Sequence, residues 1–421
     1  MESSVNIITE ADETEVLLNR YKAIRNTSLS LCLHLAAEDY VVQSMPDVSP
    51  VKWHLAHTTW FFERFVLEPY DKGYSRFDDQ YHYLFNSYYY TAGQMHPRPQ
   101  RGLLTRPLVE DIRRYRRHVD DAIIGLLNEI RDSAGIITTI EIGLNHEQQH
   151  QELMLTDIKH VFSCNPMMLV VNPDVLTSPA VSAASHRFIA GGHGVQEFGA
   201  SGQGFCFDNE LPQHPALLHE HSIGSRLITN SEYLDFIRDG GYQTCELWLS
   251  DGWAVVQERG WNRPLYWSED KQSEFTLGGQ RALDPAAPVA HVSLYEADAF
   301  ARWSGARLPT EFEWEAAASK VGVNGNFMES KYWHPVASEH NQFFGDVWEW
   351  TSSPYAAYPG FMPLDGSLGE YNGKFMCNQL TVRGGSCITA ADHIRVSYRS
   401  FFYPDARWQF LGIRLAKDGM P

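Results

Sequence analysis

The sequence predicts a two-domain protein of the α+β class, with an N-terminal four-helix bundle and a C-terminal mixed α/β, loop-rich domain. Its 421 residues exceed what one hydrophobic core ordinarily holds. Residues 1–162 contain apolar positions at helical spacing. Residues 186–421 instead contain short apolar runs, many Gly and Trp, and frequent turns. Residues 163–185, rich in Pro and small side chains, are predicted to be the linker between the two domains.

The helical pattern of the first domain falls into four stretches, and two of their starts are well marked. The stretches are 13–35, 51–68, 106–127 and 136–162. Asp47-Val-Ser49-Pro50 predicts a capped start for the second helix, and Thr105-Arg-Pro107 does the same for the third. Such bundles build metal sites from side chains on facing helices.

Two further regions complete the expected elements. The long segment 70–104, rich in Tyr, Pro and Arg, is predicted to be an ordered, non-helical functional insertion. In the second domain, short helices are expected at 230–239, 294–303 and 310–319.

Charge and composition narrow the function classes. A net charge of −18 argues against a nucleic-acid partner, which needs a basic surface. The six cysteines are scattered, as in a reduced protein without a disulfide framework. The N-terminus lacks the apolar core of a signal peptide, and no apolar run is long enough to span a membrane. We therefore expect a cytoplasmic protein.

The fourth helical stretch contains the most informative motif, "HEQQHQE" (146–152). His146 and His150 are four residues apart, so both project from one helix face and can chelate a metal. The same residues form the His-Glu-x-x-His pattern of zinc peptidases, with Glu147 as general base. The companion residues of metzincins are missing, because Leu153 and Thr156 stand at their positions. Glu152 lies about 240° round the helix from His146 and is not expected to be a ligand.

The second helical stretch supplies a third imidazole through "WHLAHTTWFFE" (53–63). His54 or His57 can face the bundle core, because residues three apart are near neighbours on a helix. One such histidine is usually a packed core residue. Three of them on two facing helices favour an open three-histidine site for Zn²⁺ or Fe²⁺.

These motifs resemble a known pairing of domains. "HLAHTTWFFE" and "HEQQHQE" resemble the DinB-like domain of the ergothioneine-biosynthesis sulfoxide synthases, the EgtB family. "RLPTEFEWEAAA", "GDVWEWTSSPY", "VRGGSC", "RVSYRSFF" and "LGIRLA" resemble the formylglycine-generating-enzyme domain, which has a C-type-lectin-like fold. The resemblance implies a non-haem Fe(2+) enzyme that joins a thiol to hercynine with O2. It also implies that His57, His146 and His150 bind the iron and that His54 does not.

The second domain is not expected to share the copper chemistry of the formylglycine-generating enzymes. Their cysteine pair corresponds to Thr389 and Ile394 in this sequence, and Cys387 has no partner nearby. The domain is expected to act as scaffold and pocket wall, and packing explains most of its Trp-rich motifs.

Hercynine is a trimethylated cation with a carboxylate and an imidazole, and these groups indicate which residue types should contact it. Gln149 lies between the two helical histidines, and its amide could reach the substrate imidazole. The trimethylammonium group favours aromatic faces, for which Trp408 and Phe410 are candidates, although packing alone would also explain both.

The insertion supplies candidates for catalysis and for the thiol. Tyr88 and Tyr89 resemble a tyrosine pair of one EgtB branch, in which a phenol donates a proton or hydrogen bond and steers the reaction toward C–S bond formation. Arg98 and Arg101 could hold a carboxylate, and Asp47 could pair with an amino group. Loop packing and solvated charge are the plain alternatives. That branch favours free cysteine over γ-glutamylcysteine.

The leading hypothesis is therefore an O2-dependent iron sulfoxide synthase acting on small molecules, without a nucleic-acid or membrane partner. Four alternatives stay open: a selenoneine synthase of the same architecture, a non-redox metal-dependent thiol transferase, a zinc peptidase and a non-catalytic binding module.

Overall fold

The computed structural model describes residues 10–129, 134–340, 342–419 and 421. The chain divides into two compact units, Met1–Val161 and Phe162–Pro421, which are described separately below. Within the described residues, no helix combines the length and the apolar character that crossing a bilayer requires.

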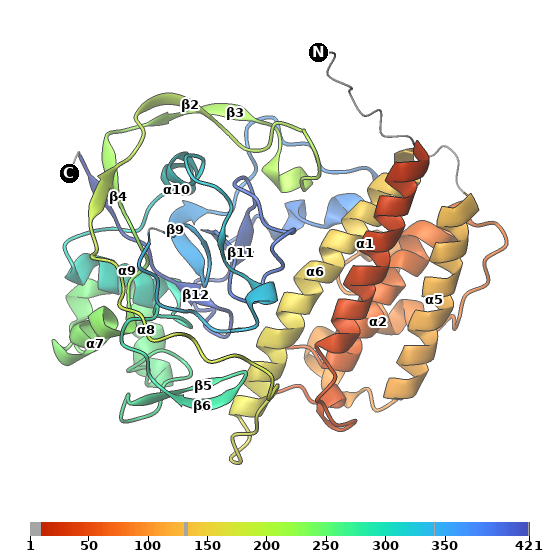
Figure 1. Cartoon of the computed structure of the whole chain (residues 1–421), viewed down its shortest axis with the longest axis horizontal. Helices are drawn as coiled ribbons and strands as arrows, with labels where there is room; N and C mark the ends of the chain where they lie inside the picture. The colour runs from red at the N-terminus through yellow and green to blue at the C-terminus, as the bar shows by residue number, and fades with distance from the viewer. Residues whose placement is uncertain (1–9, 130–133, 341, 420) are drawn as a thin grey trace, which may run out of the picture. The chain divides into compact units, whose positions relative to one another are not determined.

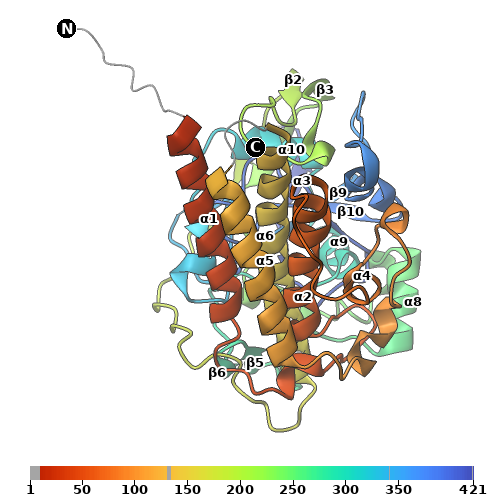
Figure 2. The same ribbon diagram turned by 90° about the vertical axis from the view of Figure 1, so that its right-hand side faces the viewer.

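The first unit is a bundle of long helices that lie side by side (Figures 1 and 2). They are α1 (Glu10–Ser30), α2 (Val51–Phe62), α5 (Val109–Glu129) and α6 (Ala134–Ser163). Every residue of α2 is buried, so this helix forms the centre of the bundle. On α5 the buried positions recur at helical spacing, for example Ile112, Val119 and Ile123, as the sequence pattern predicts.

The start of α2 differs in detail from the expected cap. Pro50 is the N-cap residue, and no side chain caps the helix. Ser49 is engaged elsewhere: its backbone N–H donates to Asp157 at 2.7 Å, and its hydroxyl accepts from Arg101 at 2.9 Å. The Ser49 groups that could cap an isolated helix are therefore hydrogen-bonded to residues distant in the sequence.

Helix α2 does not end cleanly at Phe62. It continues through a π-helical turn, Glu63–Leu67, into the short helix α3, Glu68–Tyr70. A π-helical turn adds one residue to the turn and shifts the side chains that follow it.

The insertion at 70–104 was expected to be non-helical, and this is wrong in part. It contains α4 (Tyr81–Phe85) and two 3₁₀ segments, Tyr90–Ala92 and Arg98–Leu103. These helices are too short to show a hydrophobic period in the sequence.

Buried charged groups fasten both ends of this insertion to the bundle. Near its start, the Glu63 carboxylate accepts hydrogen bonds from the Tyr74 hydroxyl at 2.5 Å and from the Phe77 N–H at 3.2 Å. At its end, the Lys52 ammonium donates to the carbonyls of Leu104 at 2.6 Å and Pro107 at 2.8 Å. The segment is therefore an anchored part of the first unit.

The second unit combines short helices with small sheets. The helices are α7 (Asn230–Arg238), α8 (Ser250–Arg259), α9 (Leu294–Trp303) and α10 (Glu311–Ala318). Three of them begin with a capping box, formed by Thr229 with Glu232, Ser293 with Glu296, and Thr310 with Glu313. Helix α8 was not expected, because only two of its ten residues, Gly252 and Val256, are buried.

The largest sheet of the described residues has four strands in the order β11-β10-β9-β12. They are β9 (Trp348–Pro354), β10 (Leu380–Arg383), β11 (Ser400–Phe402) and β12 (Leu411–Gly412). Strand β12 runs parallel to β9, and the other pairs are antiparallel.

A second, antiparallel sheet has the order β1-β4-β13. Its strands are β1 (Phe188–Ala190), β4 (His221–Gly224) and β13 (Ala416–Asp418). Three two-stranded pairs complete the unit: β2 (Gly194–Phe198) with β3 (His214–Leu218), β5 (Ser273–Thr276) with β6 (Gly279–Ala282), and β7 (Gly325–Asn326) with β8 (Phe344–Gly345).

Buried ion pairs join the Trp-rich motifs of this unit. The Glu349 carboxylate accepts from Arg414 at 2.6 and 2.8 Å and from the Trp314 indole at 2.7 Å. All three side chains are at most 1% exposed. The motifs "EFEWEAAA", "GDVWEW" and "LGIRLA" therefore meet in one core, in agreement with the packing role expected for most of them.

The expected linker, 163–185, continues α6 only through Ser163 and otherwise forms no helix or strand. Its backbone is tied to the second unit by hydrogen bonds from Val171 to Leu277, Leu176 to Lys331 and Ala184 to Ser338.

Candidate metal centre

Three histidine side chains converge in the core of the first unit. His57 lies on α2, and His146 and His150 lie one turn apart on α6. One nitrogen of each ring lies within 4.8 Å of those of the other two, and all three residues are buried. Metal–nitrogen bonds of about 2.1 Å allow two ligand nitrogens to lie up to about 4.2 Å apart. Small ring rotations would therefore let the three imidazoles bind one ion.

The contacts of His57 fit a metal ligand. Its Nδ1 donates to the carbonyl of Phe85 at 2.6 Å, and its buried Nε2 has no hydrogen-bond partner among the described residues. The ring lies between two indoles, Trp53 at 4.5 Å with a 13° interplanar angle and Trp60 at 5.6 Å with 15°. A buried nitrogen of this kind needs a partner, and a metal ion would satisfy it.

All three imidazoles are held neutral. Burial lowers the pKa of His57 and His150 well below the ordinary value, and neighbouring histidines and Arg101 lower it further. Burial also lowers the pKa of His146 to about 3, although Glu147 opposes the shift. Neutral imidazoles bind a metal without first losing a proton.

A glycine sets the distance between the two metal-facing helices. Gly143 lies on α6 three residues before His146, and a Cβ added there would lie 2.6 Å from Cε1 of Phe62 and 3.0 Å from Cε1 of Phe61 on α2. The Phe61 ring also packs on His146, with ring centroids 4.8 Å apart. The close approach of α2 and α6 therefore depends on the missing side chain at Gly143.

Glu147, the general base of the peptidase hypothesis, is fully engaged in a buried ion network. Its carboxylate accepts from Arg25 at 2.8 Å, Arg116 at 2.9 Å and the Ser28 hydroxyl at 2.6 Å. The two arginines, acting against burial, lower its pKa to about 2. A carboxylate so stabilised as an anion is a poor base, and this argues against the peptidase hypothesis.

The insertion brings a buried guanidinium close to the histidine cluster. Arg101 is 3% exposed, and its Cζ lies 3.3 Å from the centroid of the Trp53 ring, which in turn stacks on His57. Arg101 donates to the hydroxyls of Ser49 at 2.9 Å and Ser87 at 3.0 Å. Among the described residues no carboxylate pairs with it. Burial lowers its pKa well below that of a free guanidinium, Arg98 adds to this, and Asp157 opposes it.

Arg98 and Asp47 meet at the surface near Arg101. Both are exposed, and the Arg98 guanidinium donates to the backbone carbonyl of Asp47 at 2.5 Å. Arg98 and Arg101 belong to one 3₁₀ segment, in which residues three apart lie on the same side. The structure therefore brings these three predicted residues into one region of the first unit.

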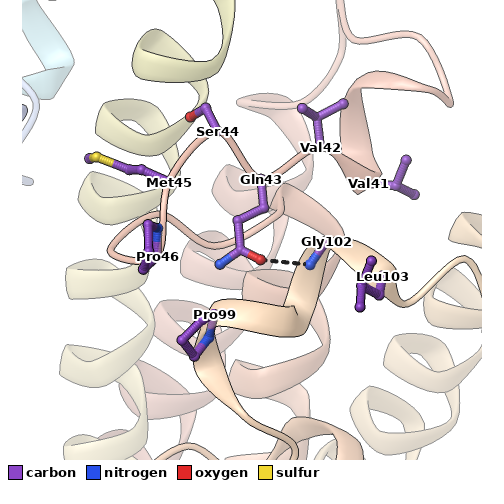
Figure 3. Close-up of a pocket in the computed structure, with 9 residues that line it drawn as sticks. All are labelled: Val41, Val42, Gln43, Ser44, Met45, Pro46, Pro99, Gly102 and Leu103. Atoms are coloured by element: carbon purple, nitrogen blue, oxygen red, sulfur yellow. Dashed lines mark hydrogen bonds between the residues drawn. The ribbon is translucent and has the colours of Figure 1, made fainter.

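Gln43 fixes the 3₁₀ segment in place, as Figure 3 shows. Its amide oxygen accepts from the Gly102 N–H at 2.7 Å, and its amide nitrogen donates to the carbonyls of Val48 and Arg98. An open hollow of about 490 Å³ lies here, lined by 41–46 together with Pro99, Gly102 and Leu103. A Cβ at Gly102 would lie 2.7 Å from the Cβ of Gln43.

Tyr88 and Tyr89 reach the surroundings of the histidine cluster through Trp60. Tyr89 is fully buried and packs on Trp60, with centroids 5.6 Å apart. Tyr88 packs on Tyr89 at 4.7 Å and is partly exposed. Burial raises the pKa of the Tyr88 phenol, although Tyr89 and Arg101 oppose the shift. Tyr88 is therefore protonated at neutral pH and can donate.

The residues suggested for hercynine are less closely grouped. Gln149 lies on α6 beside His150 and is partly exposed. Trp408 and Phe410 belong to the second unit. Phe410 is fully buried and packs on His291 at 4.5 Å, which agrees with the packing alternative for this residue.

Sequence reasoning missed the partner of His54. Its Nε2 lies 3.0 Å from the Asp157 carboxylate, and its Nδ1 lies 2.9 Å from Nδ1 of His150. A signal for this contact exists, because Asp157 follows His150 by seven residues on the same helix and therefore shares its face. The two indoles that stack on His57 lie three or four residues from it on α2, so the same helical spacing could have identified them.

Comparison with known proteins agrees with the two-domain organisation of the chain. The family model described as the DinB superfamily matches residues 20–154, and the model described as a sulfatase-modifying factor enzyme 1-like domain matches 173–342 and 335–419. A protein of Mycolicibacterium thermoresistibile named hercynine oxygenase is 31% identical over 410 residues, covering 89% of this chain and 88% of that protein.

Two further relatives cover less of the chain. The hercynine oxygenase of Mycolicibacterium smegmatis is 33% identical over 65% of this chain and 70% of its own length. The formylglycine-generating enzyme of Streptomyces coelicolor is 28% identical over 52% of this chain and 85% of its own length. With a DinB domain followed by a sulfatase-modifying-factor domain, and with relatives matched over most of its length, this chain belongs to the EgtB family of hercynine oxygenases.

Proposed function

We propose that this chain is an O2-dependent non-haem iron(II) sulfoxide synthase that joins cysteine to hercynine in ergothioneine biosynthesis. The observation that carries the proposal is the convergence of three buried, neutral imidazoles on α2 and α6, in a chain of the EgtB family. His57, His146 and His150 would hold the iron, and three neutral nitrogen ligands suit an open Fe²⁺ site. When bound, iron(II) would supply the redox chemistry with O2 that this reaction requires.

The overall reaction balances with O2 as the only oxidant. The imidazole carbon of hercynine loses a hydrogen, the thiol loses a hydrogen, and a carbon–sulfur bond forms between them. One oxygen atom of O2 ends on the sulfur, and the other leaves as water with the two hydrogens.

Arg101 supports a thiol substrate that carries a carboxylate. A buried cation without an ion-pair partner among the described residues is costly, and a bound carboxylate would offset that cost. Arg98 and Asp47 lie close enough to contribute a second cationic contact and a partner for an amino group. Together the three residues suit a small zwitterion such as cysteine.

Tyr88 and Tyr89 support the proton-donating role. The Tyr88 phenol stays protonated at neutral pH, because burial raises its pKa. It lies close enough to Arg101 for the two groups to influence each other's pKa, which puts a proton donor beside the proposed thiol site. In this proposal Gln149 contacts the hercynine imidazole.

Anaerobic loading followed by air tests the proposal. The protein is incubated with Fe(II), hercynine and either cysteine or γ-glutamylcysteine, and the products are analysed by mass after O2 is admitted. We expect a product with the summed mass of hercynine and cysteine, plus one oxygen and minus two hydrogens. His57→Ala, His146→Ala and His150→Ala should each lose both the metal and the product.

Arg101 is tested in the same assay. Arg101→Met should raise the KM for cysteine at least tenfold and leave the KM for hercynine nearly unchanged, because a charge-assisted contact is lost from one substrate only. Arg113→Met, at an exposed arginine on α5, is the matched control.

Other outcomes point elsewhere. Turnover of a thiol without O2 would indicate a non-redox thiol transferase. Turnover only with a selenosugar would indicate a selenoneine synthase. A wild-type protein that binds no metal would contradict the proposal.

A further inference from the structure

A ligand histidine needs a defined tautomer, and His150 obtains it in an unusual way. The second nitrogen of a metal-binding imidazole ordinarily donates to a carbonyl, a carboxylate or water. His57 follows this rule through the carbonyl of Phe85. In contrast, Nδ1 of His150 faces another ring nitrogen, Nδ1 of His54, at 2.9 Å. One of these two nitrogens must carry the proton, and the other must accept it.

Asp157 decides which nitrogen carries the proton. Its Oδ2 lies 3.0 Å from Nε2 of His54 and also accepts from the backbone N–H of Ser49 at 2.7 Å. An ionised carboxylate only accepts, so Nε2 of a neutral His54 carries the proton and its Nδ1 presents a lone pair. Nδ1–H of His150 then donates to that lone pair, and the lone pair of His150 is left on Nε2.

The position of these groups makes the arrangement rigid. His54 and Asp157 are each 3% exposed, so water does not compete for their hydrogen bonds. Asp157 lies on α6 with His150, and His54 lies on α2 with His57. The chain of contacts therefore links the two helices that supply the three imidazoles. Hydrogen bonds that only held the two helices together would not require a particular tautomer of either histidine.

We propose that His54 and Asp157 are positioning residues for His150, in which the Asp157 carboxylate, acting through His54, fixes the His150 tautomer that leaves Nε2 free to bind a divalent metal. The inference rests on the proposed function. It goes beyond it by assigning roles to two residues that bind no substrate and no metal.

Asp157→Leu is the informative variant, because Leu keeps the branched shape of Asp and accepts no hydrogen bond. Nε2 of His54 then loses the acceptor that holds its proton. His54 is free to carry the proton on Nδ1, against His150. His150 then shifts toward the tautomer with its proton on Nε2, which opposes metal binding. Loss of such an outer contact ordinarily weakens metal affinity roughly 10- to 100-fold, and we expect that range here.

A second variant separates this effect from misfolding. His54→Gln offers an amide oxygen that can accept from Nδ1–H of His150 without help from Asp157. The double variant His54→Gln/Asp157→Leu should therefore bind metal more tightly than Asp157→Leu alone. A merely structural role for Asp157 predicts the opposite order, because the double variant loses more native contacts.

The chain contains a matched control in its second unit. Nε2 of His334 lies 3.0 Å from the Glu274 carboxylate, and both residues are buried. Glu274→Met likewise removes the acceptor from a histidine–carboxylate pair, here one with no role at the proposed centre. Its metal affinity should equal that of the wild type.

The full chain and its variants are titrated with Co²⁺ against a chromophoric chelator, and the visible absorption of bound Co²⁺ is recorded. Co²⁺ binding needs neither O2 nor substrate, so the readout is independent of turnover. Weaker binding by Asp157→Leu, with recovery in the double variant, supports the proposal. Two results would overturn it and leave the proposed function intact: equal binding by wild type and Asp157→Leu, or a double variant that binds no better than Asp157→Leu. A wild type that binds no Co²⁺ contradicts both.

Discussion

Each of the three candidate metal ligands is held by a different kind of neighbour. His57 is fixed by a carbonyl and by an indole on either face. His150 is fixed by another histidine. His146 packs against the Phe61 ring. These contacts limit the rotation of each imidazole before a metal arrives, so less conformational entropy is lost when the site closes on the ion.

A buried carboxylate in the "GDVWEW" motif predicts a pH-dependent stability. Oδ1 of Asp346 accepts from Asn326 at 2.7 Å and from the Val336 N–H at 2.8 Å, whereas Oδ2 is buried without a partner. Burial raises the pKa of Asp346 to about 7 in the folded chain. Because the unfolded pKa is lower, about 3.9, its stabilising contribution is complete below that value and is lost as pH rises through 7.

Asp346→Asn removes this titration at little steric cost, because Asn tolerates the left-handed backbone of this position, where φ is 58°. Relative to the wild type, the variant should gain stability between pH 5 and pH 8, by up to a few kcal/mol. Urea unfolding of both proteins at the two pH values measures this change. A stability difference that is equal at both pH values would show that Asp346 does not titrate in this range.

At the scale of helices, the approach of α2 to α6 predicts a penalty at Gly143. An alanine there gains about 1 kcal/mol of helix propensity, but its Cβ would overlap the Phe62 ring, and overpacking costs about 1–3 kcal/mol. We expect Gly143→Ala to be destabilising overall, as measured by urea unfolding. Gly125→Ala on α5, where a Cβ meets nothing within 4 Å, should instead stabilise by up to about 1 kcal/mol. Equal stabilisation by both changes would mean that the two helices separate easily.

Some of the helices and site residues could be predicted from the sequence, and others could not. Long amphipathic stretches predicted the four bundle helices, and shorter helical patterns predicted α7, α9 and α10, because local signals decide such elements. Helix α8, α4 and the π-helical turn after Phe62 lack a period long enough to read. His57, His146 and His150 could be named from spacing and resemblance. The partner of His54 was missed, although Asp157 shares the α6 face of His150, because nothing local to His54 points to a residue 103 positions away.

At the scale of the whole molecule, all three candidate ligands belong to one unit. This predicts that metal binding protects only part of the chain. In hydrogen exchange followed by mass spectrometry, saturating Co²⁺ should slow exchange in peptides from α2, α6 and the region of Phe85, because binding stabilises the state that holds the ion. Peptides from α7, α9 and α10 should be unchanged. Equal protection of both units would contradict a site confined to the first.

The two anchors of the insertion, Glu63 and Lys52, have a consequence for how such enzymes diversify. Lys52 lies on α2 and Glu63 directly follows it. The stretch of chain between the two points that they hold contains Tyr88, Tyr89, Arg98 and Arg101. Residues between the two anchored points can therefore be exchanged only if the carbonyl of Phe85, which holds Nδ1 of His57, stays in place. If the proposed function holds, transplanting this stretch with both of its anchors is the way to change the sulfur donor.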